Sequence, residues 1–85
     1  MPKTTFTDSY KEMLAILIAA RRSAGVTQVE LSERLGKPQS WVSNVERGLR
    51  RVDVIEFCAI ARALGSNPGN LFGLLMERLP AKLVI

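Results

Sequence analysis

The sequence predicts an all-α fold, a compact bundle of five helices in one small domain of 85 residues. Three kinds of observation predict it: capping residues at helix starts, apolar residues at helical spacing, and glycines where helices end. The glycines that follow a helical pattern, where a left-handed C-terminal cap is typical, are Gly25, Gly36, Gly48 and Gly65. The expected helices span about residues 8–24, 27–35, 39–47, 53–64 and 68–79.

The first expected helix opens with "SYKE", Ser9–Glu12, which reads as a capping box. Its apolar stripe is formed by Leu14, Leu17 and Ile18, and Arg21 continues the same stripe one turn later. A charge on a face that turns toward the core is costly unless a carboxylate pairs with it. We therefore expect Arg21 to have an acidic partner.

The later helices carry start and stop signals of the same kind. "TQVE", Thr27–Glu30, reads as a second capping box, and "DVIE", Asp53–Glu56, as an Asp-led variant. Asn67 is a cap followed by proline at a favoured first position, and Pro80 stops the last helix. The chain is thus expected to divide into a flexible arm at 1–7, the helical domain at 8–79 and an apolar tail at 80–85.

Composition excludes several classes of function. The chain has one cysteine, Cys58, and no histidine, so a disulfide framework, a Cys/His metal site and nucleophile–histidine catalysis are all excluded. The eight acidic residues are scattered, which disfavours paired-carboxylate chemistry. We expect a protein that is not an enzyme and has no cofactor. With no long apolar run and no signal peptide, a cytoplasmic protein without a membrane partner is expected.

One face of the helix expected at 39–47 is suited to DNA. Val42 and Val45 point toward a core, whereas the opposite arc carries amides, hydroxyls and one guanidinium but no carboxylate. Amides pair with adenine edges, arginine with guanine, and hydroxyls with bases or phosphates. The residues of this arc are Gln39, Ser40, Ser43, Asn44 and Arg47, with Glu46 at its border.

The positive charge of the chain is concentrated beside that helix. Residues 34–51 hold five basic side chains and one acid, a local net of +4, which equals the net charge of the whole chain. The alternative interpretation is an ordinary solvated helix face, but such faces usually mix glutamate with lysine. The distribution favours an acidic partner, and double-stranded DNA fits it best.

The pattern of these residues resembles the Xre/Cro-type, lambda-repressor-like helix-turn-helix family over about residues 10–75. Matching elements begin at Arg21 and run through Thr27-Gln28, Glu30-Leu31, Leu35-Gly36, Gln39-Ser40, Val42-Ser43, Glu46, Gly48, Ile60-Ala61 and Ala63-Leu64-Gly65. The resemblance implies a five-helix domain whose helices 2 and 3 form the helix-turn-helix.

The resemblance also implies a role for individual residues. Gln39, Ser40 and Asn44 match positions that reach base edges in the major groove. Arg21 and Glu46 match a structural ion pair that ties helix 1 to helix 3. The residues expected at or beside phosphates are Gln28, Lys37, Trp41, Ser43, Arg47, Arg50 and Arg51. For Arg50 and Arg51, a solvated charge pair remains the alternative for one of the two.

Three positions depart from the family pattern. Ser32 stands where alanine is usual at the close crossing of helices 2 and 3, and it fits if its hydroxyl bonds back to its own helix. Pro38 stands where a capping serine or threonine is more common. Trp41 either packs over the corner between the two helices or lies against the sugar–phosphate backbone or a thymine methyl.

The apolar C-terminal end suggests self-association. One helix reads few base pairs, so a homodimer on a palindromic site is expected, acting most simply as a repressor. The alternatives are that this end folds back on helix 1, or that the domain is a protein-interaction module or an antitoxin-type partner-binding protein. The expected dimer-interface residues are Leu74, Leu75, Leu79, Leu83, Val84 and Ile85.

Overall fold

The computed structural model describes residues 7–85, which fold into five α-helices without a strand. The helices are α1 (Asp8–Ser23), α2 (Gln28–Leu35), α3 (Gln39–Glu46), α4 (Val54–Ala63) and α5 (Pro68–Arg78). The expected all-α bundle is thus confirmed, and the expected bounds agree within one residue at each end. Residues 1–6 of the expected arm lie outside the described part of the chain.

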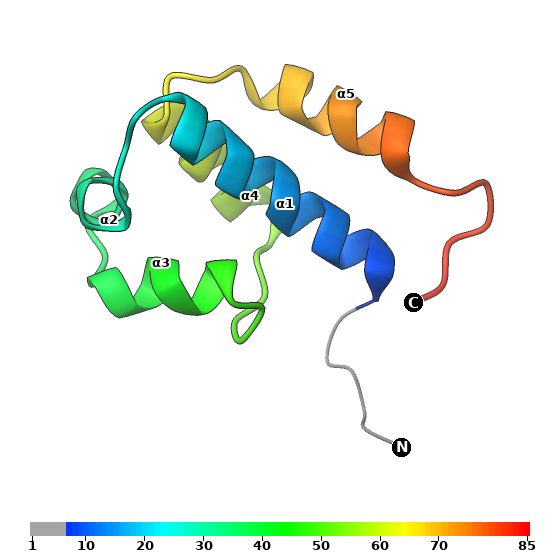
Figure 1. The fold of residues 1–85 in the computed structure, drawn as a ribbon, viewed down its shortest axis with the longest axis horizontal. Coiled ribbons are helices and arrows are strands. Elements are labelled where there is room, and N and C mark those ends of the chain that lie inside the picture. The colour runs from blue at the N-terminus through cyan, green and yellow to red at the C-terminus, as the bar shows by residue number, and fades with distance from the viewer. Residues whose placement is uncertain (1–6) are drawn as a thin grey trace.

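The long helix α1 is the centre of the bundle. It contacts α3 on one side, α5 on the opposite side and α4 behind it, while α2 packs on α3 and α4 (Figure 1). The core therefore lies where α1 meets the other helices. Its largest cluster of buried residues is Ile16, Leu17, Val26, Leu31, Val42, Phe57, Ile60, Ala61, Leu64, Leu71 and Leu75.

Side-chain caps start most of the helices, as the sequence predicts. The boxes Thr27–Glu30 and Asp53–Glu56 are both complete, and Asn67 accepts a hydrogen bond from the Asn70 N–H. The predicted box at Ser9–Glu12 is wrong. Thr7 caps α1 instead. Its backbone is extended, the helix begins at the next residue, Asp8, and its hydroxyl accepts a hydrogen bond from the Tyr10 N–H at 3.2 Å.

The corner between α2 and α3 is tight. Gly36 ends α2 with a φ of 67°, a left-handed conformation that glycine adopts without strain. Ser32 is buried at the crossing, and its hydroxyl donates to the Val29 carbonyl at 2.7 Å, so it bonds back to its own helix as expected. Pro38 occupies the N-cap of α3, where its side chain offers no acceptor.

The C-terminal tail turns from the end of α5 toward the start of α1 (Figure 1). A groove of about 400 Å³ lies between them, and Leu79, Leu83 and Val84 line it on the tail side. Leu75 was expected at a dimer interface, but it is only 7% exposed and belongs to the core of its own chain. Within residues 7–85, no helix has the length and apolar character needed to cross a membrane.

Candidate nucleic-acid interface

The polar face of α3 is accessible. Val42 and Val45 are 2% and 3% exposed and anchor the helix to the core. On the other side Gln39, Ser40 and Arg47 are exposed, whereas Ser43 and Asn44 are half-buried. The structure thus brings the three expected base-contacting residues onto one side of a helix that is fixed by its buried valines.

A chain of polar contacts fixes the start of this face to α1. Arg21 donates to both carboxylate oxygens of Glu46, at 2.6 Å from Nε and 3.1 Å from Nη2. Gln28 donates from Nε2 to Glu46 Oε1 at 2.9 Å. Gln39 then donates to Gln28 Oε1 at 3.5 Å, the long limit of a hydrogen bond. The first side chain of α3 is therefore linked through Gln28 and Glu46 to a helix outside the helix-turn-helix.

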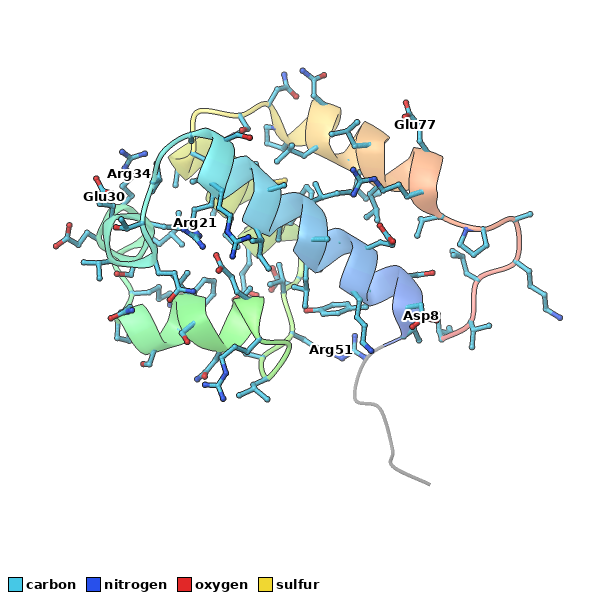
Figure 2. All side chains as sticks on the ribbon, viewed as in Figure 1. Asp8, Arg21, Glu30, Arg34, Arg51 and Glu77 are labelled. Carbon is cyan, nitrogen blue, oxygen red and sulfur yellow. The ribbon has the colours of Figure 1, made fainter. Side chains whose placement is uncertain are left out.

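The pairing of Arg21 with Glu46 takes place away from solvent. Each side chain is 11% exposed, and the third nitrogen of Arg21, Nη1, donates to the Val26 carbonyl at 2.9 Å. The arginine sits in the space between α1 and α3 (Figure 2). A charge that is buried here is thus balanced by its partner and by hydrogen bonds, which makes the contact structural.

Arg50 is engaged by several contacts within its own chain, although its side chain is 40% exposed. Its two terminal nitrogens donate to the two carboxylate oxygens of Glu56 at 3.1 and 3.0 Å, and Nη1 also donates to the Arg51 carbonyl at 2.8 Å. Its guanidinium lies 4.8 Å from the centre of the Trp41 ring. The Arg50 hydrogen bonds hold the pKa of Glu56 below its usual value, and the Asp53 backbone N–H adds to this.

Trp41 packs over the corner instead of facing outward. It is half-buried against the core cluster and lies between Arg50 and Lys37, whose ammonium is 5.9 Å from the ring centre. Its indole Nε1 is buried and finds no acceptor within the described residues. The indole N–H is therefore not available to a phosphate, and corner packing is the arrangement found.

Two features of this surface were missed by sequence reasoning. Tyr10, in the first turn of α1, accepts a hydrogen bond from the Val52 N–H and carries the Arg51 guanidinium over its ring, 5.1 Å from the centre. Leu49, beside the polar face, is 63% exposed. A tyrosine near a helix start gives no sequence signal of a partner 42 residues away, but "GLRR" itself showed an apolar residue between α3 and two arginines.

The remaining basic residues of the region are accessible. Lys37, Arg47 and Arg51 are exposed, and Arg51 lies beneath the first turns of α1 (Figure 2). Arg34 differs from them because it donates to the Ala63 carbonyl at 2.8 Å and so ties α2 to the end of α4. Lys37, Arg47 and Arg51 thus flank the polar face of α3, while Arg34, which is also exposed, binds the end of α4.

Comparison with known proteins assigns the chain to a family. A family model described as helix-turn-helix matches residues 17–71, about two thirds of the chain. An XRE-family like protein from Pseudomonas syringae pv. tomato is 46% identical, with a TM-score of 0.80, over 85% of this chain and 88% of that chain. The chain belongs to the Xre-type helix-turn-helix family. The family consists of DNA-binding transcription regulators and not of enzymes, as the sequence predicts.

Two further proteins are similar to this Xre-type chain. An uncharacterized HTH-type transcriptional regulator of Sinorhizobium fredii, y4dJ, is 44% identical over 45 residues, which span 53% of this chain and only 58% of that relative. The restriction–modification controller protein C.Esp1396I is 18% identical with a TM-score of 0.77, over 85% of this chain and 95% of that one. The latter similarity shows the shared fold.

Proposed function

We propose that this Xre-type protein binds double-stranded DNA at a specific sequence and acts as a transcriptional repressor. The observation that carries the proposal is the carboxylate-free polar face of α3. In the bound state the amides of Gln39 and Asn44 pair with adenine edges, and the Ser40 hydroxyl contacts a neighbouring base. The link from Gln39 through Gln28 to Glu46 supports this role, because it orders the amide before DNA arrives.

Phosphate contacts on both sides of α3 supply much of the affinity in this proposal. Lys37, Arg47 and Arg51 approach the DNA backbone, and Ser43 adds a hydroxyl. At the start of α2, Gln28 keeps a second amide N–H beyond the one bound to Glu46, next to unpaired backbone N–H groups that attract an anion. Each cation that neutralises a phosphate releases counterions, so binding weakens as salt rises.

Arg50 and Trp41 lie beside these proposed phosphate contacts, but each is engaged by neighbours in its own chain. The carboxylate of Glu56 balances the charge of Arg50, so Arg50 contributes less to counterion release than a full phosphate contact would. Trp41 contributes ring surface under Arg50 and Lys37 instead of a hydrogen bond.

The proposed active form is a homodimer on a palindromic site. One α3 reads only a few base pairs, and a second copy on the same DNA doubles the sequence that is read. Apolar surface for such contact is present at the C-terminal end, where the tail residues Leu83, Val84 and Ile85 are exposed together with Leu74 of α5. Leu79 is half-buried at the edge of the same surface. Occupying a promoter in this way would block transcription.

Binding of another protein is the second candidate, because the same apolar surface suits it. Phe72 and Met76 of α5 are also 49% and 59% exposed and add further apolar side chains at this end of the chain. In that case the domain would be an interaction module or an antitoxin-type protein, with the polar face of α3 serving a secondary purpose. Only the first candidate requires that the protein recognise a specific DNA sequence.

Selection of bound duplexes from a randomised DNA pool, at near-physiological salt, tests the proposal. An enriched palindrome with half-sites about one helical turn apart is the expected result. Enrichment of one short half-site would exclude the dimer and support sequence-specific DNA binding by a monomer. Absence of any enriched sequence, with binding that vanishes as salt rises, would reject specific recognition and favour the interaction module.

A further inference from the structure

The loop of residues 48–53, which joins α3 to α4, is tied down at both of its ends by its own neighbours. The N–H groups of Leu49 and Arg50 donate to the Asn44 carbonyl at 2.8 and 3.2 Å. At the far end the Asp53 N–H donates to Glu56 Oε1 at 3.0 Å, within the cap of α4. The loop that carries the two arginines is thus joined directly to a proposed base-reading residue.

Tyr10 adds a contact from a distant part of the chain. Its hydroxyl accepts from the Val52 N–H at 2.8 Å, so the middle of the loop is held against α1. Its ring also supports the Arg51 guanidinium, 5.1 Å from the ring centre. One side chain therefore holds both the backbone and a cation of the same loop.

We propose that Tyr10 is a positioning residue for the contact between the loop and the DNA backbone, a role that rests on the proposed DNA binding. A guanidinium that stacks on a ring is held over that ring, so its position in the loop is restricted before DNA binds. A long side chain that is already held also loses less conformational freedom when DNA binds. Tyr10 thus acts on DNA through Arg51 and Val52 without touching a base.

The test measures affinity for a duplex of unrelated sequence by fluorescence anisotropy at fixed low salt. Four proteins are compared: wild type, Tyr10→Leu, Arg51→Ala and the double variant. We expect Tyr10→Leu to weaken binding by about three- to tenfold in the wild-type background. In the Arg51→Ala background the same substitution should cost clearly less affinity, because the cation it positions is gone and only the Val52 contact is still lost.

Tyr10→Phe separates the hydroxyl from the ring. The ring remains under Arg51, so the affinity loss should be smaller than with Tyr10→Leu. The Val52 amide loses its acceptor, so its hydrogen exchange in the protein without DNA should become faster than in wild type. If Tyr10→Leu does not fold, Tyr10→Phe alone tests the role of Tyr10.

Asn67→Ala is the matched control for general destabilisation. It removes the cap of α5 in the connection from α4, away from the loop (Figure 1), and should leave DNA affinity unchanged. Equal losses from Tyr10→Leu in both backgrounds, or unchanged Val52 exchange in Tyr10→Phe, would overturn the role of Tyr10 alone. A wild-type protein without salt-dependent DNA binding would overturn the proposed function and this role together.

Discussion

The guanidinium of Arg21 on α1 and the carboxylate of Glu46 on α3 form a two-pronged ion pair, with 2.6 Å between Nε and Oε2. Both side chains are nearly out of solvent, and Glu46 also receives the Gln28 amide. The contact joins the first helix to the last turn of the helix that carries the polar face. It therefore helps to hold α3 against α1.

Breaking this pair should cost substantial stability. Arg21→Ala leaves Glu46 as an uncompensated, mostly buried charge, so the free energy of unfolding should fall by about 3 kcal/mol. Urea unfolding measures it. The control is Glu12→Gln, which breaks the pair of Glu12 with Arg78, where both side chains are about half exposed. That change should cost less than about 1 kcal/mol, and equal effects from the two variants would contradict the structural role of the buried pair.

Arg51 should contribute to the salt dependence of DNA binding. Arg51→Ala should lower the slope of log K against log salt by about 0.9, the value for one phosphate contact. Arg50→Ala should change the slope less, because Glu56 balances its charge. Arg62→Ala removes an exposed arginine from the end of α4 and is the control, with no change expected. An unchanged slope for Arg51→Ala, or an equal change for Arg62→Ala, would contradict a phosphate contact at Arg51.

The pair of Glu56 with Arg50 should make stability depend on pH. The pKa of Glu56 lies below its usual 4.5, chiefly through the Arg50 hydrogen bonds. Its contribution to folding is therefore complete above pH 4.5 and is lost as the pH falls through the folded-state pKa. Glu56→Gln should destabilise the protein at pH 7, and its difference from wild type should shrink as the pH is lowered.

Unfolding by urea at a series of pH values measures that difference. Glu77→Gln is the control, since Glu77 points away from the bundle on the outer side of α5 (Figure 2). Its difference from wild type should stay near zero throughout. A Glu56→Gln difference that remained constant down to pH 3 would show that the charge of Glu56 is not what stabilises the cap and the loop.

The tail should mediate the proposed self-association. Replacing Leu83 and Val84 together by serine should raise the monomer–dimer dissociation constant by about tenfold or more, because two apolar side chains are lost from each copy. Sedimentation equilibrium measures it. Ile55→Ser changes another strongly exposed apolar residue, at the start of α4, and should leave the constant unchanged. A stronger effect of Ile55→Ser would move the interface to α4, and a wild-type monomer at every concentration would exclude the dimer.

Signals that act within one helical turn were predictable from sequence. In the boxes Thr27–Glu30 and Asp53–Glu56 both partners lie three residues apart, so the pattern contains the whole interaction. The start of α1 was predicted correctly, but its capping residue was not, because Thr7 and Ser9 are both able to cap and the spacing to Glu12 favoured the wrong one. The stripe that ended in Arg21 correctly indicated a charge turned inward, although it did not identify Glu46.

Contacts between distant segments were not predictable in this way. "LRRVD" shows two adjacent arginines, but only the folded chain brings Arg50 to Glu56 and Arg51 to Tyr10. The same holds for α5, which is apolar on nearly every side. No stripe distinguishes Leu74 from Leu75, and only packing against α1 and α4 exposes the first and buries the second.

Removing the Asn44 amide tests the central claim, that the polar face of α3 reads bases. Asn44→Ala should relax base choice at the positions this amide contacts, by about 1–3 kcal/mol for a lost two-bond contact. Asn70→Ala, on an exposed turn of α5, is the matched control. The most direct measurement is selection from one randomised duplex pool with wild type, Asn44→Ala and Asn70→Ala in parallel. Only Asn44→Ala is expected to lose preference at defined positions of the site. Identical enriched sequences for all three proteins would contradict base reading by the polar face of α3.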